Sequence, residues 1–215
     1  MLLPIFPLDV VAFPGMTVPL YVFEARYRRL VRFVLEHEPK RFVIALARPK
    51  GLDADTAAIA DVGTVMDVVR VEERVDGTFE LLAHAQERTR VAPTEREDVP
   101  EPDGVTRPLY FTPLTPWPLE RDDPNEERIA AWDALEAFRR YAATVFAFDA
   151  QEQIDANLPD DPLFQASLVC ANVRVPSASR QVLLEAPSLL ARFRLAQKLI
   201  EERLAAHAPV VDEAE

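Results

Sequence analysis

The chain has 215 residues, of which 49% are hydrophobic and 28% are charged, a composition typical of one folded domain or two small ones. It carries 24 basic and 36 acidic residues, and a formal net charge of −12 disfavours nucleic acid as a partner. No segment approaches the roughly 18 uninterrupted apolar residues of a membrane-spanning helix, and a single cysteine, Cys170, excludes an internal disulfide.

The first hundred residues contain short β-rich runs and one helical pattern. The helix is expected over 24–38, ends at Pro39, and has its apolar residues at helical spacing. These apolar residues are Tyr27, Leu30, Val31, Val34 and Leu35. Asp76-Gly77 predicts a hairpin turn. The expected strands are 2–6, 17–23, 42–47, 62–75, 78–82, 88–92 and 107–112.

The second half of the chain has helical periodicity. Helices are expected to begin at Asp123-Pro124, Asp161-Pro162 and Pro187, and Ser177 is expected to cap a further helix that ends at Glu185. The apolar face predicted for the first of these helices consists of Ile129, Trp132, Leu135, Phe138, Ala142 and Val145.

These patterns predict an α+β protein with two lobes. A β-rich lobe is expected over residues 1–118, an all-helical bundle lobe over 119–208, and an acidic tail over 209–215. Residues 1–15 contain no Lys or Arg and are interrupted by prolines, so they do not form a secretory signal, and a cytoplasmic location is expected.

The sequence favours no cofactor and no metal. The 5 glycines are too scattered to build a phosphate-binding loop. Asp53 and Asp55 lack the companions of a calcium loop, and no serine lies in a nucleophile elbow. No catalytic residue is therefore assigned, although a hydrolase whose catalytic residues converge from distant positions stays open as an alternative.

Aromatic residues gather around the expected lobe boundary, together with prolines. They are Tyr110, Phe111, Trp117 and Trp132. Aromatic side chains are common anchors at interfaces, so these four are the candidate polypeptide-binding residues. The alternative interpretation is that they only pack the lobes together.

The amino-terminal sequence resembles that of a known family. The stretch from Phe6-Pro7-Leu8-Asp9 to Phe13-Pro14-Gly15, followed by Val18-Pro19-Leu20-Tyr21-Val22-Phe23-Glu24-Ala25-Arg26-Tyr27, is similar to the amino-terminal domain of Lon, the ATP-dependent protease La. Phe23-Glu24-Ala25-Arg26-Tyr27 looks closest to the stand-alone Lon-domain proteins of bacteria. Weaker matches extend to about residue 206 and include Val62-Gly63-Thr64, Asp76-Gly77-Thr78 and the stretch from Leu81 to Val91.

The resemblance implies a barrel-like β lobe of the pseudouridine-synthase-and-archaeosine-transglycosylase (PUA) type, followed by a helical bundle. It also implies substrate recognition without the ATPase and peptidase domains of Lon. The expected function is a non-enzymatic module that binds an unfolded or partner polypeptide, with no nucleic-acid or membrane partner and with weak homo-oligomers left open. An RNA-binding PUA-like protein is a further alternative, which the net charge of −12 disfavours.

Overall fold

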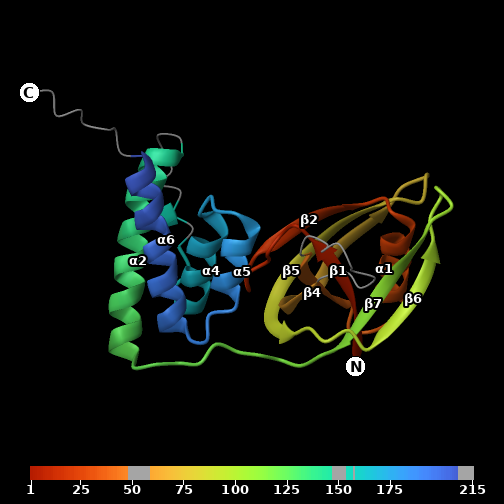
Figure 1. Cartoon of the computed structure of the whole chain (residues 1–215), viewed down its shortest axis with the longest axis horizontal. Helices are drawn as coiled ribbons and strands as arrows, with labels where there is room; N and C mark the ends of the chain where they lie inside the picture. Colours follow the sequence, from red (N-terminus) through yellow and green to blue (C-terminus); the bar gives the residue numbers. More distant parts are fainter. Residues whose placement is uncertain (48–58, 147–153, 157, 208–215) are drawn as a thin grey trace, which may run out of the picture. The chain divides into compact units, whose positions relative to one another are not determined.

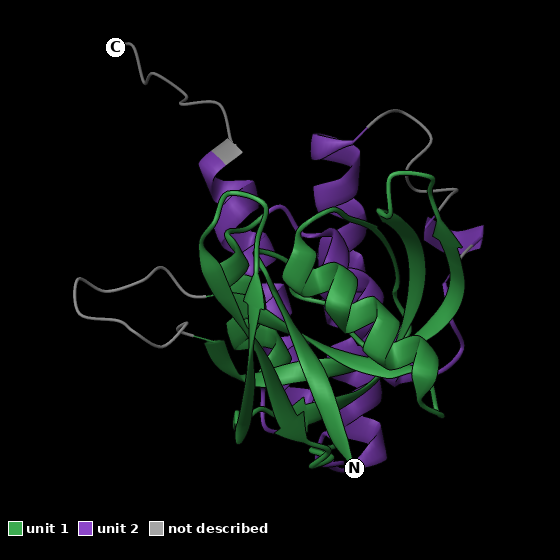
Figure 2. Ribbon diagram, turned by 90° about the vertical axis from the view of Figure 1, so that its right-hand side faces the viewer, with its two compact units in different colours: residues 1–118, 175–185 green, residues 119–174, 186–215 purple. Residues whose placement is uncertain are grey.

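The computed structural model describes residues 1–47, 59–146, 154–156 and 158–207 (Figure 1). The expected tail over 209–215 and the acidic pair Asp53 and Asp55 lie outside these residues. The chain divides into two units, one formed by residues 1–118 with 175–185 and the other by 119–174 with 186–215 (Figure 2). Among the described residues, no helix has the length and apolar character needed to span a membrane.

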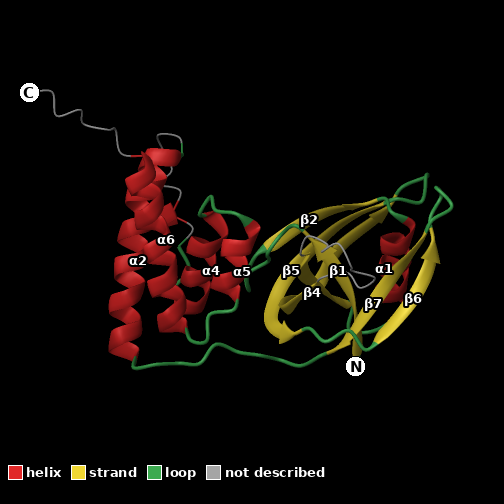
Figure 3. Ribbon diagram, in the orientation of Figure 1, coloured by secondary structure: helices red, strands yellow, loops and turns green. Residues whose placement is uncertain are grey.

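Seven strands form the sheet of the first unit (Figure 3). They are β1 (Leu2–Leu8), β2 (Thr17–Val22), β3 (Arg41–Ala47), β4 (Ile59–Glu73), β5 (Phe79–Arg90), β6 (Glu95–Pro100) and β7 (Thr106–Pro113). Their order is β2-β5-β4-β3-β1-β7-β6, with β1 and β3 parallel and the other neighbours antiparallel. Strands β2 and β6 therefore lie at the two edges.

Helix α1 (Ala25–Glu36) packs on one face of this sheet. Four of its predicted apolar residues are buried, and Leu35 is partly buried. They contact a cluster that includes Phe6, Phe42 and Phe79, whereas Ile5 and Val43 belong to a separate cluster. Successive residues of a strand thus pack into two different hydrophobic clusters, because side chains along a strand point alternately to its two faces.

Two strand predictions differ from the structure. The runs expected at 78–82 and 88–92 form one strand, β5, and β6 lies where a connecting segment was expected. In β6 only Val99 is buried, and the charged residues around it suit an exposed edge. Its strand character comes from pairing with β7, which a local sequence pattern does not reveal.

Helix α5 (Ser177–Leu184) belongs to the first unit, although its segment was expected in the helical lobe. Gln181 Nε2 donates to the carbonyl of Val62 on β4 at 2.9 Å. Ser177 Oγ donates to the carbonyl of Asp9 at 3.2 Å and makes no cap hydrogen bond, so the expected capping role is wrong. Residues 175–185 thus return from the helical segments to the sheet.

The second unit contains helices α2 (Pro124–Val145), α4 (Pro162–Asn172) and α6 (Leu189–His207). Asp123 and Asp161 cap the first two helices, as predicted. On α2, Leu135, Phe138 and Ala142 are buried, but Ile129 and Trp132 are 61% and 64% exposed. The α6-facing side of α2 instead continues through small residues, Ala130, Ala131 and Ala134, which pack with Phe193. Alanines permit close helix packing, and they place the two larger side chains on the outside.

The α+β fold class predicted from the sequence is confirmed.

Candidate polypeptide-binding surface

An aromatic pair is exposed on and just after edge strand β2. Val18 and Val22 point into the core, so the alternating residues face outward. Tyr21 and Phe23 are 54% and 61% exposed, and their rings stack with centroids 6.0 Å apart. We call these two residues the aromatic patch. Exposed aromatic side chains that contact each other are candidates for binding a partner.

An open groove of about 430 Å³ adjoins the aromatic patch. Cross-strand neighbours on β2, β5 and β4 form it, with Pro19 opposite Leu82 and Tyr21 opposite Glu80. Its lining residues are Pro19, Leu20, Tyr21, Arg70, Glu72, Glu80, Leu81 and Leu82. The lining of the groove thus combines apolar side chains with charged ones, which suits an apolar segment of another chain.

The charged groups beside the groove are paired with each other. Arg70 contacts Glu72 at 3.4 Å, and Arg74 forms an ion pair with Glu80. The Arg74 guanidinium also lies 5.8 Å from the centroid of the Tyr21 ring. In these ion pairs each arginine charge is neutralised by a glutamate, and the Arg74 guanidinium packs against one side of the Tyr21 ring.

Strand β2 is poorly suited to extending the sheet with a bound peptide. It is an edge strand, but Pro19 at its centre has no N–H group to donate. Proline on an edge strand discourages the addition of another strand. We therefore expect a ligand to contact side chains of the groove and the aromatic patch more than the free backbone edge.

Two histidines and three serines that could serve catalysis have structural partners. His84 Nδ1 lies 3.2 Å from Thr17 Oγ1, and His37 Nδ1 lies 2.7 Å from the carbonyl of Phe33. Ser167 and Ser177 donate to backbone carbonyls, and the Ser188 hydroxyl accepts from the N–H of Ala191. Within the described ranges, no three His, Cys, Asp or Glu side chains are arranged to hold a metal ion.

The thiol of Cys170 is fully buried in the second unit. Burial raises its pKa to about 12, because the thiolate loses its hydration there. A buried thiol with a raised pKa is a poor nucleophile, so this cysteine acts as a small apolar core residue.

Tyr110 and Phe111 are both buried and lie in different clusters of the first unit. Phe111 packs edge-on against Phe33 of α1, with centroids 5.1 Å apart. Tyr110 belongs to the cluster of Ile5 and Val43. Neighbouring residues of one strand point to opposite faces, so the two rings do not form one surface.

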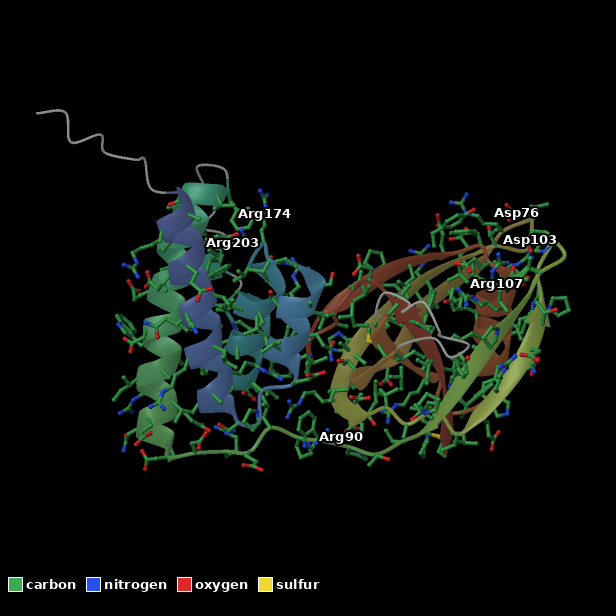
Figure 4. All side chains as sticks on the ribbon, in the orientation of Figure 1. Asp76, Arg90, Asp103, Arg107, Arg174 and Arg203 are labelled. Atoms are coloured by element: carbon green, nitrogen blue, oxygen red, sulfur yellow. The ribbon has the colours of Figure 1, made fainter. Side chains whose placement is uncertain are left out.

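Trp117 is half-buried beside the end of β5, where Figure 4 labels Arg90. The guanidinium carbons of Arg88 and Arg90 lie 4.3 and 3.6 Å from the centroid of its ring. Arg88 is buried, and its Nη1 donates to the carbonyl of Leu184 at the end of α5 at 2.6 Å. Trp117 therefore takes part in joining β5 to α5. Of the four predicted aromatic residues, Trp132 on α2 is the exposed one.

The Phe-Glu-x-Arg-Tyr motif builds the beginning of α1. Arg26 contacts Glu24 at 3.0 Å and lies over the Tyr27 ring at 4.3 Å. Tyr27 packs on Phe6, and burial raises the pKa of its hydroxyl to about 12. The same motif contains Phe23, whose exposure the sequence interpretation missed. The available signal was the alternation along the strand, in which Tyr21 and Phe23 flank the inward-facing Val22.

The sheet with α1 packed on one face, together with helices α2, α4 and α6, defines an α+β protein. The model of the ATP-dependent protease La (LON) substrate-binding domain matches residues 2–202, and the chain belongs to this family. The family resemblance expected from the sequence is thus confirmed.

Relatives and solved structures agree with this assignment. Lon protease of Escherichia coli K12 is 24% identical over 206 residues, and Lon protease 2 of Desulfotalea psychrophila is 24% identical over 207 residues. Both matches cover 94% of this chain and 25% of the relative, so the chain spans about a quarter of their length. The structure of the N-terminal domain of Mycobacterium avium complex Lon protease has a TM-score of 0.70 at 17% identity, covering 94% of this chain and 99% of that one. The Lon N-terminal domain protein from Xanthomonas campestris has a TM-score of 0.56 at 21% identity, covering 95% of this chain and 98% of that one.

Proposed function

We propose that this protein is a non-enzymatic module that binds apolar segments of unfolded or partner polypeptides, with the aromatic patch and its groove as the binding surface. The observation that carries the proposal is the exposed stack of Tyr21 on Phe23 beside the apolar groove. Membership of the LON substrate-binding family supports the same class of ligand.

The mechanism is weak capture through side chains. An apolar segment would cover the two exposed rings and the groove residues Pro19 and Leu82. Removing apolar surface from water provides the free energy, and a single short segment covers little area, so affinity would come from several contacts along a chain.

Fluorescence anisotropy of a labelled, permanently unfolded polypeptide tests the proposal. We expect saturable binding by the wild-type protein and at least about tenfold weaker binding by the double variant Tyr21→Ser, Phe23→Ser, because aromatic anchors commonly contribute more than about 1 kcal/mol each. Val105→Ser is the matched control, since Val105 is 52% exposed on another hairpin of the same unit. Equal affinity of the double variant and the wild type would overturn this surface assignment.

Trp132 and Ile129 give a second candidate surface, since both are more than half exposed on one side of α2. The variant Trp132→Ser in the same titration decides between the two surfaces. A folded protein and a single-stranded RNA serve as parallel ligands. Binding to RNA that weakens steeply with salt would favour the RNA-binding alternative instead.

A further inference from the structure

Helix α1 carries four arginines, and one of them lacks an acidic partner. Arg26 contacts Glu24 at 3.0 Å, Arg29 contacts Glu97 at 2.8 Å, and Arg32 contacts Glu73 at 3.6 Å. Glu24 is the residue before the helix, Glu97 lies on β6 and Glu73 is the last residue of β4. Arg28 has no carboxylate partner among the described residues, and its Nε is buried without a hydrogen-bond acceptor.

The unpartnered guanidinium lies against the turn between β4 and β5. A side-chain carbon built at Gly77 would lie 3.5 Å from Arg28 Nη1 and 3.9 Å from Arg32 Nη2. Two guanidinium groups therefore approach the same point, four residues apart on one helix. Like charges at this spacing repel each other, and nothing in their own helix compensates for Arg28.

The turn does not supply the missing acceptor. The Gly77 N–H donates to the carbonyl of Arg74 at 2.9 Å. Asp76, labelled in Figure 4, directs its carboxylate to the N–H and hydroxyl of Thr78 at 3.0 and 2.7 Å. Asp76 Oδ1 is thus occupied within the turn, and the Asp76 carboxylate forms no ion pair with Arg28. Because Arg28 Nε is buried, a carboxylate from outside would meet the Nη groups of this side chain.

A carboxylate matches this arrangement better than a neutral group does. It accepts hydrogen bonds with two oxygens, it pairs with a guanidinium in a planar, bidentate manner, and it would reduce the repulsion between Arg28 and Arg32. Glu73 remains the competing anion for Arg32, and both of those side chains are more than half exposed, at 53% and 56%. A half-exposed ion pair is weak enough to rearrange around a ligand.

The β4–β5 hairpin, whose turn Arg28 approaches, also contacts the aromatic patch. Arg74, whose carbonyl accepts from Gly77, holds its guanidinium 5.8 Å from the centroid of Tyr21. We propose that Arg28, assisted by Arg32, is a carboxylate-binding subsite that makes this protein prefer polypeptide segments with an acidic residue near apolar ones. This inference rests on the proposed function for its ligand.

Two labelled peptides of equal length test the preference, an apolar peptide with one Glu and the same peptide with Gln in its place. We expect the wild-type protein to bind the Glu peptide at least about fivefold more tightly at low salt, and Arg28→Gln to abolish that difference. Arg96→Gln is the matched control, because it removes the same charge from an exposed pair on β6. Arg28→Lys keeps the charge without the planar fork and should retain only part of the preference.

A second measurement does not depend on peptide binding. In the wild-type protein, the NMR signal of the Arg28 Nε–H is followed during titration with N-acetylglutamate amide and, as control, N-acetylglutamine amide. A saturable shift with the carboxylate alone supports the subsite, even if neither peptide binds and the proposed function is wrong. No shift, together with equal affinity for the two peptides, would overturn the subsite and leave the proposed function standing.

Discussion

Glu101 Oε1 accepts a hydrogen bond at 2.8 Å from the backbone N–H of Arg26, although 75 positions separate the two residues. Its other oxygen accepts from the N–H of Ala25 at 2.7 Å. The residue before the helix, Glu24, makes no cap hydrogen bond. A buried carboxylate after β6 thus satisfies the first donors of α1 and interacts favourably with the helix dipole.

Replacing Glu101 should therefore destabilise the first unit. We expect Glu101→Ala to lower the free energy of unfolding by about 1–2 kcal/mol, the usual effect of losing a cap. Glu101→Gln keeps one acceptor oxygen and should lose less. Urea unfolding of both variants measures this, with Glu95→Gln at the beginning of β6 as control, since Glu95 is exposed. A Glu101→Ala midpoint equal to that of the control would contradict the capping role.

Strands β3 and β4 approach each other so closely at position 63 that only glycine fits there without a shift of the backbone. A side-chain carbon at this position would lie 2.5 Å from the carbonyl oxygen of Ile44 on β3. We expect Gly63→Ala to cost roughly 1–3 kcal/mol of stability, because the backbone of β3 must move. Gly104→Ala gives the contrast, since Gly104 has φ +80° but no atom within 4 Å of the new carbon. Thermal unfolding compares each variant with the wild type, and a Gly63→Ala protein as stable as the wild type would refute the steric argument.

Trp117→Ala should weaken the structure and not only binding. Trp117 was predicted to bind polypeptide, but its ring packs on Arg88 and Arg90. We expect a loss of about 2 kcal/mol and faster amide exchange in α5, since Arg88 also holds the carbonyl of Leu184. Trp132→Ala, at a site 64% exposed, should change stability by less than about 0.5 kcal/mol. Equal stability of the two variants would restore Trp117 as a surface residue.

Glu127 couples the stability of the second unit to pH. Its side chain is buried, and hydrogen bonds from Arg121 hold the pKa of its carboxyl below the ordinary value, against the opposing effect of burial. A lowered pKa in the folded state stabilises the protein above the unfolded pKa, and this contribution is lost as pH falls through the folded value. Urea unfolding between pH 6 and pH 3 should show the difference between wild type and Glu127→Gln shrinking at low pH. A constant difference across this range would contradict the coupling.

Local features of the fold could be predicted because a few neighbouring residues decide them. The spacing of Tyr27, Leu30 and Val34 specifies the buried side of α1, and Asp123 and Asp161 cap helices whose N–H groups lie within three positions. Gly77 permits the positive φ of its turn by itself. These signals need no information from elsewhere in the chain.

The binding surface was harder to predict, because exposure depends on what packs against a residue. Tyr110 and Phe111 have the composition of surface anchors but lie in two cores, whereas Ile129 has the composition of a core residue and lies outside. Tyr21 and Phe23 were noticed as part of a family motif and not as exposed rings.

The sequence by itself determined the family, the α+β class, the starts of α2 and α4 and the hairpin turn, since their signals are motifs and patterns of residues close together in the chain. Only the tertiary structure decided that β6 joins the sheet, that α5 returns to the first unit, that Glu101 caps α1 and that Arg28 is left without a carboxylate. The physical reason is that these contacts form between residues far apart in sequence. Packing and the closure of long loops select such partners, and a local sequence pattern does not reveal them.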